Sequence, residues 1–219
     1  MKMTFEPFEE ARVRGFLHRP EQPNGNAIVL THGAGSNCNA PLLVAVAGEF
    51  AVAGLIALRC DLPYRQARPS GPPSPGGAAA DREGLRDAVA AVRRIAAGRV
   101  YLGGHSYGGR QATMLAASDP SVTEALLLLS YPLHPPRKPP ELRTAHFPKL
   151  ATTAAFVHGA RDPFGTIEEM RTALALIPGK TALLEIEGAG HDLKGAKSAA
   201  RAVKHFLDLT FCYNSDSPS

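Results

Sequence analysis

The sequence contains no tryptophan, only three cysteines, and no apolar run that is long and charge-free enough to span a bilayer. The cysteines, Cys38, Cys60 and Cys212, are odd in number and far apart, so we expect reduced thiols rather than a metal-type pair. The first residues carry acids early and lack the apolar core of a secretory signal. These absences predict a cytoplasmic protein that has no membrane segment.

The signatures of nucleic-acid and nucleotide binding are also missing. The net charge is +4, but lysine and arginine are scattered and do not form the basic stripe of a nucleic-acid binder. No Gly-x-x-x-x-Gly-Lys-Ser/Thr phosphate loop occurs. Residues 33–38 begin like a dinucleotide fingerprint, but Cys38 stands where its third Gly or Ala belongs. We therefore expect neither a nucleic-acid partner nor a nucleotide cofactor.

What the sequence does contain is a regular alternation of strand and helix patterns. Of its 219 residues, 44% are hydrophobic, which suits one globular α/β domain. Apolar runs typical of strands covered on both faces lie at 27–31, 55–60 and 124–131. Further strand patterns lie at 99–102, 153–158 and 181–186. Helical patterns lie between and after them, at 42–53, 81–98, 110–117, 166–177 and 194–209. This order predicts a doubly wound, mainly parallel sheet flanked by helices over residues 1–211, followed by a disordered tail over 212–219.

Four further segments carry local predictions. The alternating residues 11–18 suit an edge strand, and the Pro- and Gly-rich residues 63–77 suit an exposed loop. Asp81 is placed to cap the helix that follows this loop. Residues 132–149 hold six prolines and are expected to resist regular structure.

The strongest chemical signal is the sequence Gly-Gly-His-Ser-Tyr-Gly-Gly at 103–109. A strand pattern precedes it and a helix pattern follows, which is the context of a nucleophile elbow. Such a turn pushes Ser106 outward at the cost of strained backbone, while Gly104 and Gly108 relieve crowding between strand and helix. We interpret Ser106 as a nucleophile.

A serine nucleophile needs a base and a carboxylate behind that base. His191 and Asp162 each follow a predicted strand, and the chain order Ser106, Asp162, His191 is that of the α/β-hydrolases. Asp61, at another strand end, is the reserve acid, whereas Asp192 adjoins His191 and is expected to point elsewhere. The other histidines are expected to be packing or surface residues, and His158 to make a structural hydrogen bond.

The negative charge that develops on the substrate oxygen needs two backbone donors. The N–H of Tyr107, directly after the candidate nucleophile, supplies one. The loop after the 27–31 strand supplies the other, which we assign to Ala34. A plain glycine turn is the simpler interpretation of that loop on its own.

These motifs resemble the α/β-hydrolase superfamily over nearly the whole chain. Residues 32–35, 62–64, 103–110, 130–134, 159–165 and 190–191 are most similar to small hydrolase-like proteins related to dienelactone hydrolases and to the testis-expressed hydrolase-like protein. The resemblance implies catalysis without a metal or an organic cofactor. Dienelactone hydrolases use a cysteine nucleophile, and this chain has Ser106 in its place.

The expected function is that of a serine hydrolase acting on an ester, thioester or related acyl bond of a small molecule. A non-catalytic interaction protein on the same fold and a peptidase are the alternatives. The superfamily often inserts a cap where only residues 132–149 stand here, so we expect an open site. Basic residues near strand ends, namely His134, Arg137, Lys138, Arg143, Arg65 and Arg68, are either a rim that favours anionic esters or solvated loop charges.

Overall fold

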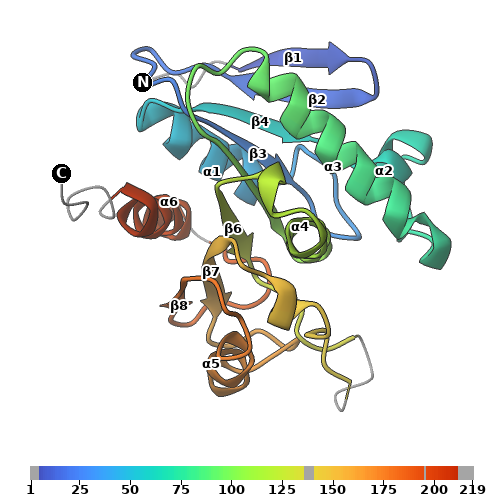
Figure 1. Ribbon diagram of the computed structural model, residues 1–219, viewed down its shortest axis with the longest axis vertical. Helices are drawn as coiled ribbons and strands as arrows, with labels where there is room; N and C mark the ends of the chain where they lie inside the picture. Colours follow the sequence, from blue (N-terminus) through green and yellow to red (C-terminus); the bar gives the residue numbers. More distant parts are fainter. Residues whose placement is uncertain (1–4, 136–140, 195, 212–219) are drawn as a thin grey trace.

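The computed structural model describes residues 5–135, 141–194 and 196–211, and Figure 1 shows a twisted sheet with helices on both sides. Its eight strands lie in the order β1-β2-β4-β3-β5-β6-β7-β8. From β4 to β8 all neighbours are parallel, and β2 joins β1 and β4 antiparallel. The strands are β1 (Phe5–Glu10), β2 (Val13–His18), β3 (Ala27–Thr31), β4 (Ile56–Cys60), β5 (Val100–His105), β6 (Ala125–Leu129), β7 (Thr153–Gly159) and β8 (Thr181–Ile186). The predicted tail at 212–219 lies outside the described residues.

Helices cover the sheet on two faces. The α-helices are α1 (Pro41–Val52), α2 (Pro63–Ala67), α3 (Ala78–Arg93), α4 (Tyr107–Ser118), α5 (Ile167–Leu174) and α6 (Ala196–Phe211). Short 3₁₀ turns are η1 (Pro75–Gly77), η2 (Pro120–Val122) and η3 (Phe147–Lys149). One hydrophobic cluster joins the sheet to α3, α4 and α5, and a second joins the opposite face to α1 and α6. The predicted doubly wound α/β sheet is therefore confirmed.

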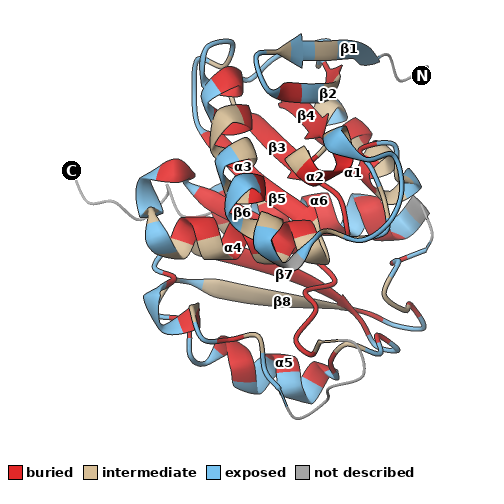
Figure 2. Cartoon of the chain, turned by 90° about the vertical axis from the view of Figure 1, so that its right-hand side faces the viewer, coloured by how far each residue is buried: buried red, intermediate tan, exposed pale blue. Residues whose placement is uncertain are grey.

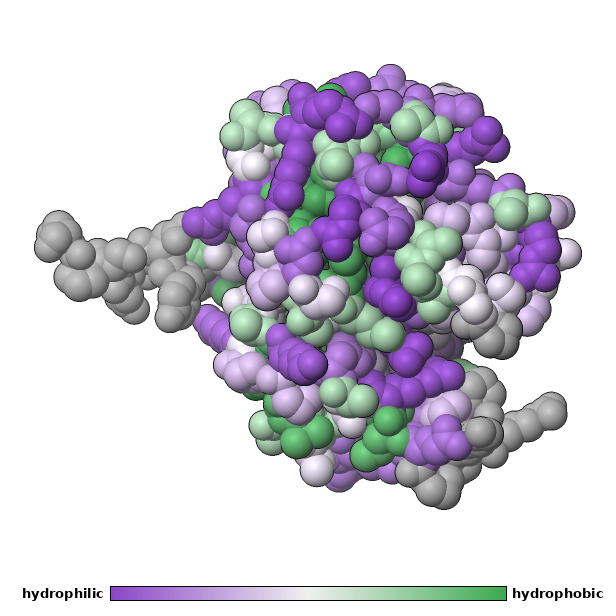
Figure 3. Space-filling model, turned by 45° about the vertical axis from the view of Figure 1, so that its right-hand side comes forward, coloured by the Kyte–Doolittle hydropathy of each residue, from purple (hydrophilic) through white to green (hydrophobic). Residues whose placement is uncertain are grey.

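Burial follows this layering. Every residue of β3, β4 and β6 is buried, because helices cover both sides of these strands. Figure 2 shows the central strands as buried and β8 as mostly intermediate, in keeping with its place at one edge. On the face seen in Figure 3, hydrophobic residues show mostly as small patches between hydrophilic ones. No helix among the described residues is long and apolar enough to cross a membrane.

The predicted edge strand at 11–18 is wrong in its position within the sheet. β2 has neighbours on both sides, and the edge strand on this side of the sheet is β1, which the sequence did not predict. β1 has the sequence Phe-Glu-Pro-Phe-Glu-Glu and is mostly exposed, so it lacks the apolar pattern of a covered strand. Its charges and Pro7 suit an edge, where unpaired strands are otherwise prone to aggregate.

The predictions for residues 63–81 are wrong in two respects. The predicted exposed loop begins with α2, in which Tyr64 and Arg65 are buried. Helix α3 begins at Ala78, three residues before Asp81, so Asp81 is not its cap. The Asp81 side chain is instead fully buried and accepts hydrogen bonds from the Tyr64 N–H at 3.1 Å and the Tyr107 hydroxyl at 2.7 Å.

The segment between β6 and β7 stays short and largely irregular. Its described residues contain η3 as their single helical turn, and they add no cap domain over the carboxyl ends of the strands. Helix α5 follows β7 and begins with the reciprocal hydrogen bonds of a capping box between Thr166 and Glu169. The loops that carry the predicted site residues follow the carboxyl ends of β3, β5, β7 and β8.

Candidate active site

Ser106 occupies the strained turn between β5 and α4. Its φ of 51° and ψ of −114° lie where non-glycine residues are rare. A Cβ on Gly104 would come within 2.8 Å of the Gly108 carbonyl carbon, and one on Gly108 within 2.6 Å of the His32 carbonyl oxygen. The predicted strain and the predicted need for glycine at both flanks are thus present.

The three predicted triad side chains lie in one hydrogen-bonded line. His191, in the loop after β8, has its Nε2 2.8 Å from Ser106 Oγ and its Nδ1 2.8 Å from Asp162 Oδ2. With an ionised Asp162, Nδ1 carries the proton and donates it, so Nε2 is free to accept from the serine hydroxyl. The arrangement can therefore remove the hydroxyl proton while a carboxylate stabilises the resulting imidazolium.

Neighbouring groups hold the loop after β7 that carries Asp162. The Asp162 carboxylate is fully buried as a side chain and accepts the Phe164 N–H at 2.9 Å. His158 donates from Nε2 to the Gly165 carbonyl at 2.8 Å, as its predicted structural role requires. The Phe164 ring meets the His191 ring edge-on, with centroids 4.6 Å apart. Asp162 and His191 are thus both fixed from the same loop.

The competing acids interact elsewhere. Asp61 accepts the Cys38 N–H at 2.7 Å and lies 3.4 Å from Nε2 of His32. Asp192 is exposed and forms an ion pair with Lys194 at 2.9 Å. Of the three carboxylates considered from the sequence, Asp162 is the one that is hydrogen-bonded to His191.

His105 is a residue whose role the sequence did not predict. Its Nε2 donates to the His191 carbonyl oxygen at 2.7 Å, which ties the loop of the candidate base to the strand of the candidate nucleophile. Burial lowers the pKa of His105 to about 4, so the ring stays neutral near pH 7. The alternation of side chains along β5 is a signal for its position, because it places His105 and Ser106 on opposite sides of the strand.

The two predicted oxyanion donors are available. Among the described residues, neither the Tyr107 nor the Ala34 N–H takes part in a hydrogen bond. The loop of Ala34 lies beside the candidate nucleophile, since a Cβ on Gly33 would come within 3.4 Å of Ser106 Cβ. The Gly108 N–H donates to the His32 carbonyl at 3.2 Å and links this loop to α4.

Side chains from α2 hold the loop of Ala34 through its carbonyl groups. The Tyr64 hydroxyl lies 3.1 Å from the Gly33 carbonyl oxygen and 2.9 Å from that of Ala34. Burial raises the pKa of Tyr64 to about 12, so its hydroxyl remains a donor. The Gly33 carbonyl and the Ala34 N–H belong to one planar trans peptide and point in opposite directions. A donor on that carbonyl therefore fixes the direction of the Ala34 N–H.

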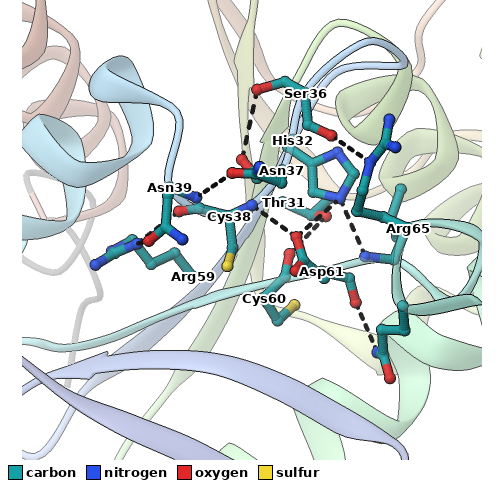
Figure 4. Close-up of polar contacts among 12 residues, drawn as sticks. Thr31, His32, Ser36, Asn37, Cys38, Asn39, Arg59, Cys60, Asp61 and Arg65 are labelled. Carbon is teal, nitrogen blue, oxygen red and sulfur yellow. Dashed lines mark hydrogen bonds and ion pairs between the residues drawn. The ribbon is translucent and has the colours of Figure 1, made fainter. Parts of the chain in front are cut away.

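A second set of contacts holds the same loop further along, as Figure 4 shows. Arg65 donates to the Ser36 carbonyl at 2.7 Å and to the Ala34 carbonyl at 3.2 Å. The buried Arg59 donates to the Cys38 carbonyl at 2.7 Å and to the Asn39 side chain at 2.8 Å. Burial raises the pKa of Cys38 to about 12, so this thiol is a poor nucleophile. The cluster is a support for the loop that leads into α1.

The suggested basic rim is present only in part. Arg65 is 5% exposed, and its guanidinium donates hydrogen bonds to four backbone carbonyls rather than facing solvent. Arg68 donates to the Pro72 carbonyl, and His134 is buried against Glu169. Arg143 is half-buried, while Arg137 and Lys138 lie outside the described residues. In the part of the chain that the structure describes, no group of three His, Cys, Asp or Glu side chains could hold a metal ion.

The family model of the alpha/beta hydrolase domain matches residues 24–211. The chain belongs to the alpha/beta hydrolase family, as its motifs predict. No curated protein sequence matches the chain.

Solved structures give the same fold. A dienelactone hydrolase from Anabaena variabilis is similar with 19% identity, a TM-score of 0.73 and 97% of each chain covered. An alpha-beta serine hydrolase homologue from Coxiella burnetii has 16% identity and a TM-score of 0.74, covering 93% of this chain and 97% of that one. A lidless a/b serine hydrolase from Xanthomonas campestris has 13% identity and a TM-score of 0.73, covering 99% and 97%. Identities this low show the fold alone.

Proposed function

We propose that this protein is a serine hydrolase that cleaves a carboxylic ester, thioester or related acyl bond of a small molecule. The observation that carries the proposal is the pair of 2.8 Å contacts that joins Ser106, His191 and Asp162. A hydroxyl, an imidazole and a carboxylate in this order are the parts that acyl transfer through serine requires. The strained backbone at Ser106 supports it independently, because such strain gathers at functional sites.

In the proposed reaction Ser106 Oγ attacks the acyl carbon while His191 Nε2 takes the hydroxyl proton. The N–H groups of Tyr107 and Ala34 stabilise the negative charge that develops on the carbonyl oxygen. His191 then gives the proton to the leaving group, and an acyl-enzyme remains on Ser106. A water molecule activated by His191 attacks this ester, releases the acid and restores the serine.

The substrate is proposed to be small because the site is open. The described part of the segment between β6 and β7 forms no cap over the strand ends. Short or medium acyl compounds can reach Ser106 from solvent, whereas a large lipid would gain little surface to bury. The ester bond is the main candidate, and the amide bond of a peptide is the alternative that uses the same residues.

A fluorophosphonate probe tests the proposal, since it labels serines activated by a base. We expect labelling of the wild-type protein and none of Ser106→Ala. Ser118→Ala, at the far end of the same helix α4, is the matched control and should label as wild type. A folded wild-type protein that never labels would favour a non-catalytic interaction protein instead. Short esters, thioesters and peptides tried on wild type and Ser106→Ala then identify the bond.

A further inference from the structure

The first two turns of α1 are apolar on every side, although the helix lies at the surface. The whole helix, Pro-Leu-Leu-Val-Ala-Val-Ala-Gly-Glu-Phe-Ala-Val, carries one charged side chain, Glu49. A surface helix normally sets polar residues on the side away from the core. Here Pro41 is exposed and Leu42 and Ala45 are partly exposed, at the end of α1 nearest the candidate active site. The fold alone does not account for this apolar side.

These residues form one wall of a cavity of about 610 Å³. Leu193 and Ala199, from the segment that leads into and forms α6, line the opposite wall. The remaining lining residues are Ser36, Ala40, His105, Asp192 and Lys194. The volume lies within the range of small-molecule sites, and such sites are mostly apolar with a few polar groups.

Sequence neighbours of all three parts of the candidate site line the cavity, whereas Ser106, Asp162 and His191 themselves do not line it. Ser36 belongs to the loop that carries the Ala34 N–H, His105 precedes the nucleophile, and Asp192 follows the candidate base. The position of Gly33 shows how close the cavity wall is to Ser106. A Cβ added to Gly33 would come within 3.0 Å of His105 Nδ1 and within 3.4 Å of Ser106 Cβ. His105, on the cavity wall, and Ser106 therefore both lie against the same glycine.

Leu193 is held in the cavity wall at a conformational cost. Its φ is +47°, a left-handed value that bulky side chains rarely adopt, and its side chain is 1% exposed. The strain turns an apolar residue inward directly after Asp192, whereas an exposed loop would tolerate a glycine or asparagine there. The loop of the candidate base thus contributes an apolar surface as well as the imidazole.

We propose that this cavity binds the apolar chain of the ester substrate, and that the natural substrates carry an aliphatic group of medium length. The inference rests on the proposed function for its chemistry, because the chain must end at the bond that Ser106 attacks. Each methylene moved from water into an apolar wall favours binding by an amount that corresponds to about a fourfold change in affinity. The same chain could enter from the acyl side or from the alcohol side of the ester.

Two ester series test this specificity. The first is p-nitrophenyl esters with acyl chains from two to eight carbons, and the second is acetate esters of alcohols of the same lengths. We expect kcat/KM to rise by about fourfold per methylene in one of the series, which then identifies the side that enters the cavity. Equal rates along both series would overturn the proposal.

Ala45→Phe fills the cavity from α1, so the ratio of eight-carbon to two-carbon kcat/KM should fall at least tenfold. Val52→Phe introduces the same aromatic ring at an exposed position at the other end of α1 and should keep the wild-type ratio. Leu42→Asn, which makes the wall polar, serves as the second variant if Ala45→Phe does not fold. A folded Ala45→Phe or Leu42→Asn protein with an unchanged ratio would place the chain elsewhere.

A binding measurement separates this proposal from the proposed function. Ligand-observed NMR with Ser106→Ala should detect octanoate but not acetate, and Ala45→Phe in that background should abolish the octanoate signal. If no ester is hydrolysed but octanoate still binds in this manner, the hydrolase proposal fails and the apolar site stands. If esters are hydrolysed and octanoate binding ignores the Ala45 substitution, the cavity proposal fails alone.

Discussion

The buried carboxylate of Asp81 accepts a 2.7 Å hydrogen bond from the hydroxyl of Tyr107. The same carboxylate accepts the Tyr64 N–H at 3.1 Å. Tyr107 supplies one proposed oxyanion donor, and Tyr64 holds the carbonyl groups that direct the other. One acid on α3 therefore supports both sides of the proposed oxyanion site. The rings of Tyr64 and Tyr107 also meet edge-on, with centroids 5.8 Å apart.

Asp81→Asn tests this link. The amide has one oxygen to accept with and adds an N–H₂ group beside two donors, so we expect a loss of about 1–3 kcal/mol in the free energy of unfolding. Ester hydrolysis should lose about tenfold in kcat, because Tyr107 and Tyr64 are no longer held. Urea denaturation and kinetics on Asp81→Asn, Tyr107→Phe and the double variant measure the coupling, expected at about 0.5–3 kcal/mol. Additive losses would show that the two side chains act independently.

Tyr64→Phe removes the hydroxyl that holds the Gly33 and Ala34 carbonyls. The Gly33 carbonyl keeps its contact with His32 Nδ1 at 2.9 Å, but the Ala34 N–H is held less tightly. A poorly aimed donor stabilises the transition state less than a preorganised one does. We expect kcat to fall by about tenfold with little change in KM, since Tyr64 is buried and its hydroxyl contacts the loop backbone. Tyr101→Phe, at the opposite end of β5, is the matched control and should keep the wild-type kcat. A rise in KM with an unchanged kcat would assign Tyr64 to substrate binding instead.

The sequence predicted most of what local pattern determines. The run at 27–31 matches β3, because a covered strand is continuous and apolar, and the strand pattern at 181–186 matches β8. Glycine spacing located the strained turn at Ser106. Three features could not be predicted from the sequence for a shared reason. Each depends on a partner that is distant along the chain. β1 is a strand because it pairs with β2, Asp81 is buried because two tyrosines donate to it, and His105 matters through the carbonyl of His191. None of these partners is visible in a window of neighbouring residues.

The proposed acid can be separated from its neighbours by three matched substitutions. Asp162→Asn keeps the side-chain shape but cannot stabilise the imidazolium, so kcat should fall by about 10⁴-fold. Asp192→Asn removes an exposed carboxylate next to His191 and should cost less than threefold. Asp61→Asn changes the support of the Cys38 N–H and should affect stability more than kcat. Steady-state hydrolysis of a short ester at pH 7 compares the three, and a larger loss in Asp61→Asn would make Asp61 the acid.

The pairing of His18 with Arg59 predicts a pH dependence of stability. Burial and the nearby Arg59 charge lower the pKa of the fully buried His18 from 6.5 to about 4. Between these values the unfolded chain binds a proton that the folded chain does not, so stability falls as the pH falls from 6.5 to 4. Protonation of His18 in the unfolded chain lowers the free energy of unfolding by at most about 3 kcal/mol over this pH range.

Urea denaturation of wild type and His18→Gln across this pH range measures the contribution. The glutamine oxygen can still accept from Arg59 Nε but does not titrate, so the stability of the variant should depend less steeply on pH. The partly buried His105 and His146, whose pKa values desolvation also lowers to about 4, add to the wild-type slope and remain in the variant. Parallel curves for the two proteins would contradict the assignment of a shifted His18.

Gly108→Ala tests whether the close approach of α4 to the loop after β3 holds the site together. The new Cβ would come within 2.6 Å of both the His32 carbonyl oxygen and the Thr31 Cγ2 atom, and the backbone oxygen cannot move aside without displacing the loop of Ala34. We expect a loss of about 1–3 kcal/mol or more in the free energy of unfolding, together with loss of fluorophosphonate labelling in whatever fraction still folds. Gly76→Ala adds the same methyl where nothing lies within 4 Å, so its stability should stay within about 0.5 kcal/mol of wild type and its labelling should be complete. Because the two substitutions are chemically identical, equal stability and labelling would mean that the elbow tolerates a Cβ at Gly108, and the packing of helix against loop would then not be what positions Ser106.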